Sequence, residues 1–185
     1  MVPACPAWAV RDVVGHVVGV AEDLFAGLNG PFNDKQTAQQ VDRHRDDDFA
    51  QLLDHWAETA RPWEQGLSAT PGPPLLDLVT HEHDIRGALG QPGARDDEAV
   101  RIISERLLHF EPPVPLTIEV EDAVVRLGPS GDDPIVLRTT RWELIRWRMG
   151  RRSRKQLAGM DWSADTGPLL DHLVFLGPAQ EDVIE

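Results

Sequence analysis

Hydrophobic residues in the N-terminal part of the chain recur every three or four positions, as they do on one face of an amphipathic helix. This spacing predicts a helix from about Trp8 to Leu28, a second from Phe49 to about Gly66 and another around Val100 to Leu108. Between the last two, a third helix is predicted from about Leu75 to Leu89, with Gly90 as its C-terminal stop and Pro92 behind it. The stretch from Pro31 to Asp48 is polar and ends in a run of charged residues, so it is predicted to be a loop.

The pattern changes in the C-terminal part, where β-branched residues alternate or cluster. Leu116 to Val120 and Ala123 to Leu127 are predicted to be the strands of a hairpin, and Ile135 to Arg138 a third strand. Helical spacing returns from Thr140 to Met149. The tail from Asp161 is rich in glycine, proline and acidic residues, and it is expected to wrap the surface.

Breaks in the pattern divide the chain. Asn29-Gly-Pro31 is expected to end the first helix, and Pro71-Gly-Pro-Pro74 to form a rigid turn before the third. At the proline-rich segment Glu111-Pro-Pro-Val-Pro115, the helical spacing of apolar residues gives way to clusters of β-branched residues, which predicts a domain boundary. The expected fold class is therefore α+β and mainly α, with a helical bundle at residues 1–111 and a small α+β domain with an extended tail at residues 112–185.

Composition narrows the class of function. The 185 residues carry a net charge of −13 at pH 7, which argues against non-specific binding to nucleic acid because phosphate neutralisation needs a basic face. No apolar run approaches the length of a membrane span, and no basic-then-apolar segment suggests a secretory signal. Cys5 is the only cysteine, which excludes an internal disulfide and fits a reducing cytoplasm.

Asp77 and His81 are the first candidates for chemistry. They are four residues apart in a predicted helix, so their side chains project from one face, one turn apart. A carboxylate and an imidazole so placed can bind one divalent cation, and His16 in the first predicted helix is the natural third ligand. Two imidazoles and a carboxylate suit Zn²⁺, with Fe²⁺, Mn²⁺ and Ni²⁺ as alternatives, and they leave coordination positions for water, a thiol or a substrate.

Neighbouring residues have more ordinary interpretations. A single histidine beside an apolar face, such as His16, is more often structural than a ligand. Asp12 lies one turn before His16 and is expected to orient its second ring nitrogen. Asp84 continues the face of Asp77 and His81 and is the nearby candidate for a general base, whereas Glu82 is interpreted as a solvated residue.

The basic segment Gly150-Arg-Arg-Ser-Arg-Lys155 offers a second group of candidates. Arg151 and Arg152 could bind a carboxylate bidentately, which lysine does less well. The alternative is that they balance acidic neighbours in an acidic chain. The segment lacks the interleaved aromatic residues of a nucleic-acid groove.

Three segments together resemble a known family. Val2-Pro-Ala-Cys-Pro-Ala-Trp-Ala-Val-Arg-Asp-Val-Val-Gly-His16 resembles the opening of the mycothiol-dependent maleylpyruvate isomerase family, and His81-Glu-His-Asp-Ile-Arg-Gly-Ala-Leu-Gly90 is similar to a later segment of that family. Gly150-Arg-Arg-Ser-Arg-Lys-Gln156, followed by Asp161-Trp-Ser163, resembles its C-terminal stretch. The resemblance implies a DinB-like metal-binding helical bundle followed by a small α/β domain, a divalent metal, and mycothiol as the thiol partner.

Carried over by position, the resemblance implies that His16, Asp77 and His81 bind the metal. Aspartate stands at position 77 where the family has glutamate, so the metal must lie closer or be reached through water. Ala9 stands where the family has serine or threonine, so the first helix loses its expected N-cap. Family members carry another helix before this opening segment. The expectation is that the chain forms a homodimer through the face so exposed, or that the natural protein begins upstream of Met1.

The function implied is a mycothiol-using isomerase or thiol S-transferase that acts on a small electrophile. Arg152 and Arg151 would hold the carboxylate of the substrate or of the thiol, with Asp84 as a further cofactor contact. Two alternatives stay open: a metal-binding regulatory protein without catalysis, and a metal-dependent hydrolase in which Asp84 is the general base. Expected partners are a small-molecule substrate and a low-molecular-weight thiol, with no nucleic acid and no membrane.

Overall fold

The computed structural model describes residues 1–28, 33–66 and 73–185, which form two compact units, Met1–Pro92 and Gly93–Glu185. The predicted helix stop at 29–31 and residues 71 and 72 of the predicted turn lie outside the described residues. The turn prediction is wrong for Pro73 and Pro74, which begin a helix. The boundary between the units lies earlier than the one expected at residue 111. Helix α5 (Glu98–Leu107), which ends just before residue 111, packs against α6 (Arg141–Arg148) and therefore belongs to the second unit.

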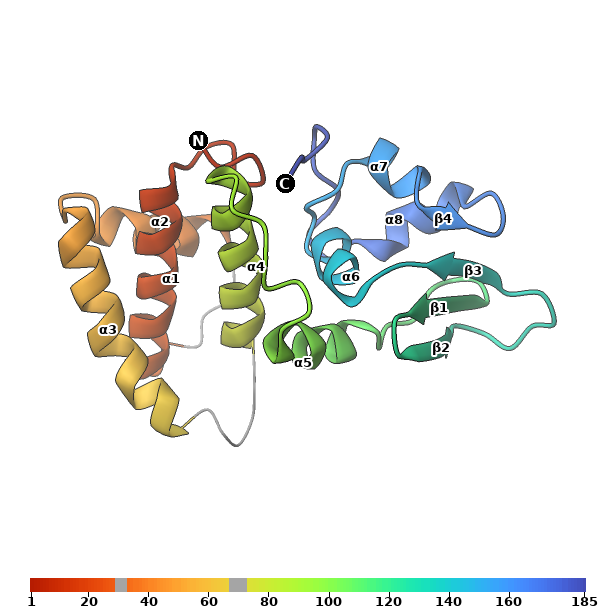
Figure 1. The fold of residues 1–185 in the computed structure, drawn as a ribbon, viewed down its shortest axis with the longest axis horizontal. Coiled ribbons are helices and arrows are strands. Elements are labelled where there is room, and N and C mark those ends of the chain that lie inside the picture. The colour runs from red at the N-terminus through yellow and green to blue at the C-terminus, as the bar shows by residue number, and fades with distance from the viewer. Residues whose placement is uncertain (29–32, 67–72) are drawn as a thin grey trace. The chain divides into compact units, whose positions relative to one another are not determined.

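The first unit is a helical bundle, in agreement with the expected fold class. Its described helices are α1 (Val10–Phe25), α2 (Asp34–Arg43), α3 (Phe49–Gly66) and α4 (Pro73–Ala88). Figure 1 shows α1 between α3 and α4, and α1 packs against the three other helices. The apolar face that predicted α1 is the one that it buries, since Val13, Val17 and Val20 are all less than a tenth exposed.

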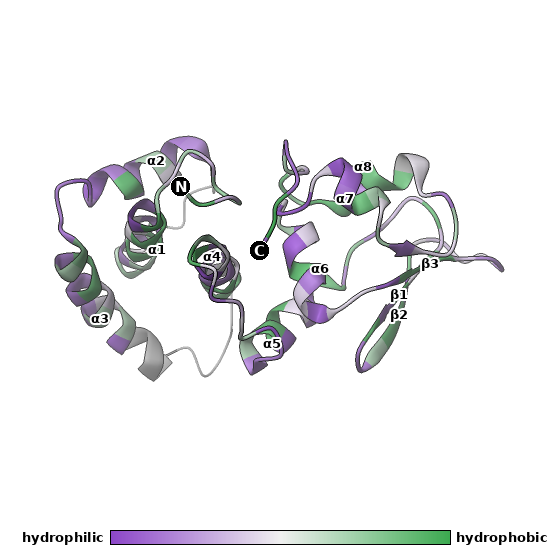
Figure 2. Cartoon of the chain, turned by 45° about the horizontal axis from the view of Figure 1, so that its top comes forward, coloured by the Kyte–Doolittle hydropathy of each residue, from purple (hydrophilic) through white to green (hydrophobic). Residues whose placement is uncertain are grey.

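Helix α2 contradicts the prediction of a loop at residues 31–48. The Asn33 side chain caps the helix by accepting a hydrogen bond from the Gln36 amide at 3.0 Å. Helix α2 has no apolar stripe and is mostly hydrophilic in Figure 2. It docks on α1 through polar contacts instead, because Gln40 and Arg43 donate hydrogen bonds to Asp23 at 2.7 and 2.6 Å.

The second unit combines a sheet with short helices. Its elements are α5 (Glu98–Leu107), β1 (Leu116–Val120), β2 (Ala123–Leu127), β3 (Ile135–Arg138), α6 (Arg141–Arg148), α7 (Arg154–Ala158), β4 (Asp161–Trp162), a 3₁₀ turn (Gly167–Leu169) and α8 (Leu170–Leu173). The strand order is β2-β1-β3-β4, in which β1 pairs with β2 in an antiparallel and with β3 in a parallel arrangement. The predicted hairpin and third strand are confirmed.

The tail does more than wrap the surface. Leu169, Leu170 and Leu173 are buried in the same core as Trp147 of α6 and Ile118 of β1. The expectation for the tail was therefore wrong for this stretch, because a short apolar cluster follows the glycine and proline residues and fills the core of the second unit.

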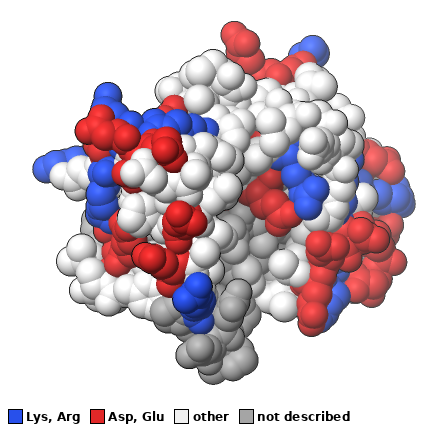
Figure 3. Space-filling model, turned by 60° about the vertical axis from the view of Figure 1, so that its left-hand side comes forward, with Lys and Arg blue, Asp and Glu red and all other residues white. Residues whose placement is uncertain are grey.

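None of the described helices is long and apolar enough to cross a bilayer. On the face of the molecule shown in Figure 3, acidic side chains are prominent and basic ones lie among them, so this face has no broad basic patch. The distribution of charge on this face agrees with the acidic composition.

Candidate metal centre

Helices α1 and α4 pack together and bring the three predicted ligands into one group. His16 lies on α1, and Asp77 and His81 lie one turn apart on α4. The two histidines are only 4% and 6% exposed, whereas the Asp77 side chain keeps 20% of its surface accessible. The predicted helix face is therefore the one that meets α1.

The facing atoms of the three side chains are closely spaced. His16 Nε2 lies 3.5 Å and His81 Nε2 lies 3.6 Å from Asp77 Oδ1, and one ligand atom from each residue lies within 4.8 Å of the others. The ligand atoms of a tetrahedral zinc ion, at bond lengths of about 2.0–2.2 Å, are about 3.4 Å apart. The shorter aspartate side chain at position 77 thus reaches the position that a shared ion requires.

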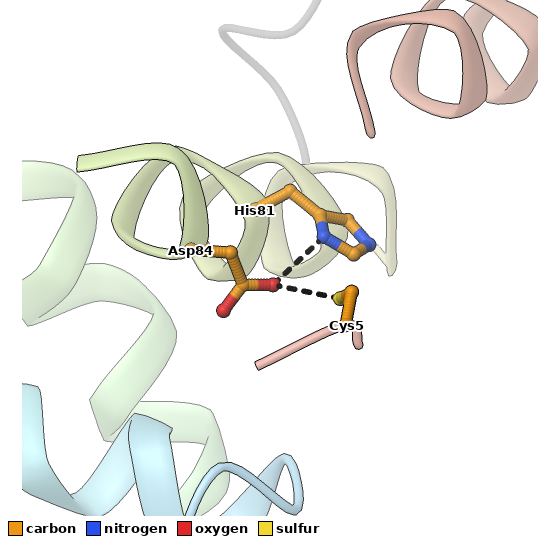
Figure 4. A group of neighbouring side chains, drawn as sticks. All are labelled: Cys5, His81 and Asp84. Carbon is orange, nitrogen blue, oxygen red and sulfur yellow. Dashed lines mark hydrogen bonds and ion pairs between the residues drawn. The ribbon is translucent and has the colours of Figure 1, made fainter. Parts of the chain in front are cut away.

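Asp84 fixes the orientation of His81. Its Oδ2 lies 2.9 Å from His81 Nδ1, and because a carboxylate only accepts, Nδ1 carries the hydrogen. The lone pair of His81 is then on Nε2, the atom that faces Asp77. The same carboxylate oxygen accepts a hydrogen bond from the Cys5 thiol at 3.5 Å, and Figure 4 shows it between the His81 ring and the Cys5 side chain. A carboxylate behind a metal-binding imidazole is a common arrangement in metal sites.

The N-terminal loop covers this group of side chains. The Val2 amide donates to the Trp8 carbonyl and the Trp8 amide to the Cys5 carbonyl, both at 2.8 Å, so the loop is tightly folded. Its Trp8 ring lies 5.1 Å from the His16 ring and 6.2 Å from the His81 ring, centroid to centroid. We did not predict these contacts of Trp8 and Cys5 from the sequence. The one signal for these contacts in the sequence was that both residues lie in the segment Val2–His16, which resembles the opening of the family.

The Asp12 carboxylate, the expected partner of His16 Nδ1, caps α1 instead. Asp12 accepts a hydrogen bond from the Ala9 amide at 2.8 Å and so caps the start of α1, where Ala9 has no side-chain oxygen to do so. His16 Nδ1 is buried and has no hydrogen-bond partner among the described residues. The prediction that Asp12 orients His16 was therefore wrong, because the helix terminus uses the carboxylate.

Other candidates near the centre have clear environments. The Asp84 side chain is fully buried, which suits an orienting group better than a general base or a direct contact to a cofactor. Glu82 points to the surface and forms an ion pair with Arg86 at 2.9 Å, as its interpretation as a solvated residue implied.

An apolar cavity of about 290 Å³ lies next to Asp77, between α1, α3 and α4. Its walls include Val17, Val20, Trp56, Ala60, Leu75 and Leu78. None of the described residues that line it carries a positive charge. Asp77 thus belongs both to the group of candidate ligands and to the lining of an apolar cavity.

Arg151 and Arg152 lie in the second unit and are both buried. Arg152 donates to both oxygens of Glu143 at 2.5 and 2.8 Å and lies 3.4 Å from Glu185 Oε1. Burial lowers the pKa of Arg152, but the hydrogen bond and the charge of Glu143 raise it above its ordinary value. Arg151 donates to the Met149 carbonyl at 2.7 Å. Arg152 thus binds a carboxylate bidentately, as expected, but this carboxylate is the Glu143 side chain and not a substrate or a thiol.

Gly150 forms the turn between α6 and the two arginines. It follows α6 with a φ of 77°, and a side-chain Cβ at this position would lie 2.5 Å from the Gly177 carbonyl oxygen. Only glycine fits both requirements. The Gly-Arg-Arg sequence therefore ends α6 and begins the link to α7.

Comparison with known proteins agrees with the geometry of the first unit. Residues 1–86 match the family model described as the mycothiol maleylpyruvate isomerase N-terminal domain, a DinB-like helical domain. Neither the curated proteins nor the solved structures gave a match. The matched segment includes all three candidate ligands and Asp84. The first unit of this chain therefore belongs to the mycothiol maleylpyruvate isomerase N-terminal domain family.

Proposed function

We propose that this protein is a divalent-metal enzyme, with zinc as the preferred ion, that uses mycothiol to isomerise or conjugate a small electrophile. The observation that supports it most directly is the close approach of His16 Nε2, His81 Nε2 and Asp77 Oδ1. Family membership supports the link to mycothiol. The donor set, two imidazoles and one carboxylate, fits zinc and leaves a coordination position for a thiol.

A divalent ion bound here would lower the pKa of a coordinated thiol and so make it nucleophilic at neutral pH. His16, Asp77 and His81 would hold the ion. Asp84 keeps the Nε2 lone pair of His81 directed to the centre. The Trp8 ring lies beside the two imidazoles and contributes an apolar wall to the centre.

The cavity beside Asp77 supports a substrate that is small and mainly apolar. Its walls are aliphatic and aromatic, and its volume of about 290 Å³ is at the lower end of small-molecule sites. We also propose that Arg152 and Arg151 bind a carboxylate of the thiol or of the substrate. That part rests on the resemblance of the Gly150-Arg-Arg segment, since Arg152 already pairs with Glu143.

The two alternatives make different demands on the same residues. A hydrolase needs a base that reaches water, and the buried Asp84 carboxylate, held by His81 and Cys5, does not offer one. A metal-binding protein without catalysis needs the same three ligands but no thiol. Activity with a thiol therefore distinguishes the enzyme from the binding protein.

The test combines metal analysis with a thiol-transfer assay. Purified protein without an affinity tag should contain a divalent ion that His16→Ala and His81→Ala remove, whereas Glu82→Ala keeps it. The metal-loaded protein should accelerate the reaction of mycothiol with the apolar electrophile monochlorobimane, and His81→Ala should abolish this. If both histidine variants keep the wild-type metal content, the assignment of the ligands is wrong. If the metal is bound but no electrophile in a panel that includes maleylpyruvate reacts faster with mycothiol, the non-catalytic alternative is correct.

A further inference from the structure

A second group of histidine and aspartate side chains lies in the first unit, apart from the residues of the candidate metal centre. His44 ends α2, Asp47 lies in the link to α3, and His55 lies on α3. One ligand atom from each lies within 4.8 Å of the others. We call these three residues the His44 group.

The contacts within the His44 group are centred on one carboxylate oxygen. Asp47 Oδ2 lies 2.8 Å from His44 Nδ1 and 3.7 Å from His55 Nε2. The His44 and His55 rings are 5.6 Å apart, centroid to centroid. The separation between His55 and Asp47 is close to the value of about 3.4 Å between the ligand atoms of a tetrahedral zinc ion, whereas the separation between His44 and Asp47 is shorter. An increase of about 0.6 Å in the separation between Asp47 and His44 would bring it to the same value.

Glu22 on α1 occupies the position behind His44 that Asp84 occupies behind His81. Its Oε2 lies 3.2 Å from His44 Nε2. A neutral imidazole donates only one hydrogen bond, and here carboxylates face both ring nitrogens. If Nε2 donates to Glu22, the lone pair of Nδ1 points to Asp47 and His55, which is the arrangement that a metal ion needs.

The surrounding charges leave this arrangement intact. Arg43 pairs with Glu22 at 2.7 Å and with Asp23 at 2.6 Å. The guanidinium of Arg11 donates to the backbone carbonyls of His44, at 3.1 Å, and of Asp47, and so fixes the turn that carries the group. The hydrogen bonds of both arginines are thus directed away from the Asp47 carboxylate.

Exposure suggests how such a site would behave. His44 is 5% exposed, whereas the His55 side chain is 45% exposed, so one side of the group is open to solvent. Water would complete the coordination, and the affinity should be lower than at the buried centre of His16, Asp77 and His81. Two imidazoles and a carboxylate select transition ions such as Zn²⁺ or Ni²⁺ over Mg²⁺ or Ca²⁺.

We propose that His44, Asp47 and His55 form a second, weaker binding site for a divalent transition-metal ion, with Glu22 orienting His44. An ion bound there would join the end of α2 to the start of α3. The proposal does not rest on the enzymatic function proposed above, because the two sites share no residue.

The test measures metal stoichiometry on full-length protein without an affinity tag. Metal-free protein is dialysed against Zn²⁺, and the bound metal is quantified. The wild type should bind about two ions per chain, and His16→Ala and His55→Ala should each bind about one. His172→Ala, which removes an exposed histidine of the second unit, should bind as many as the wild type. Glu22→Gln should weaken the lower-affinity site by about tenfold or more while it leaves the other site unchanged.

Each outcome separates the two sites. A wild type that binds one ion, lost in His16→Ala and kept in His55→Ala, overturns this proposal and leaves the candidate metal centre intact. Two ions in His16→Ala and one in His55→Ala would support the His44 group and contradict the candidate centre. Equal losses in His55→Ala and His172→Ala would show that surface histidines bind zinc without a site, and would also overturn the proposal.

Discussion

The contribution of Asp84 to metal binding can be tested by removing its carboxylate. Asp84→Ala leaves His81 Nδ1 without its acceptor at 2.9 Å and allows the imidazole ring to rotate or to change tautomer. Loss of such a carboxylate behind a metal-binding histidine costs about 10–100-fold in metal affinity, which corresponds to about 1.4–2.7 kcal/mol. Because Asp84 is fully buried, we expect the upper part of this range.

Asp84→Asn separates orientation from charge. The amide oxygen can still accept from His81 Nδ1, so the ring keeps its orientation while the negative charge behind it is lost. The loss of affinity should therefore lie between those of the wild type and Asp84→Ala. Glu82→Ala is the matched control, since it removes a carboxylate from the same helix whose partner is Arg86 at the surface.

The assay is a competition titration of Zn²⁺ against a chelator of known affinity, with circular dichroism to verify that each variant is folded. The expected order of affinity is wild type and Glu82→Ala together, then Asp84→Asn, then Asp84→Ala. An Asp84→Ala protein that is folded and binds zinc within about twofold of the wild type would refute the orienting role, since about 0.4 kcal/mol is too little for it.

Three further predictions concern stability. Gly19→Ala should lower the free energy of unfolding by about 1–3 kcal/mol in urea titrations, because its Cβ would lie 2.7 Å from Gln40 Cβ in the contact between α1 and α2; an unchanged value would contradict this packing. Burial raises the pKa of Asp23, but hydrogen bonds from Gln40 and Arg43 lower it below its ordinary value of 3.8. The stability that Asp23 contributes relative to Asp23→Asn should thus be complete above that pH and be lost as the pH falls through the lower folded-state pKa; a difference independent of pH would refute this. Burial lowers the pKa of Arg148 to about 10, but its Nη1 donates a buried hydrogen bond to the Leu173 carbonyl and its guanidinium lies 4.2 Å from the centre of the Phe110 ring. Arg148→Met leaves this carbonyl without its donor and should therefore lower the melting temperature; an unchanged or higher one would contradict this.

The elements that could be predicted are those whose signal is local. The period of apolar residues located α1, α3 and α5 because each buries one face against a neighbour, whereas the end of α4 was located by Gly90 and Pro92. Asp77 and His81 were identified together because residues four apart on a helix always share a face. The pairing of the two with His16 depended on the packing of α1 against α4, for which the sequence offered only a family resemblance.

The elements that were missed depend on contacts between distant residues. Helix α2 was not predicted because it has no apolar period, and the hydrogen bonds from Gln40 and Arg43 to Asp23 hold it in place. Trp8 and Cys5 approach the centre only because the N-terminal loop folds back over α4. Patterns of hydrophobicity contain no information on contacts of this kind.

The two halves of the predicted active site differ in electrostatic terms, and this difference decides how much each supports the function. In the first unit, the lone pair of His81 and a carboxylate oxygen of Asp77 face each other at 3.6 Å, an arrangement that a cation stabilises. In the second unit, Arg152 already holds a carboxylate in the bidentate geometry that was expected for a substrate. A substrate carboxylate would have to displace Glu143 from a buried ion pair, at a cost that its own binding must exceed. The metal centre can therefore be inferred from the arrangement of its side chains, whereas a role for Arg152 requires a rearrangement that binding itself would have to drive.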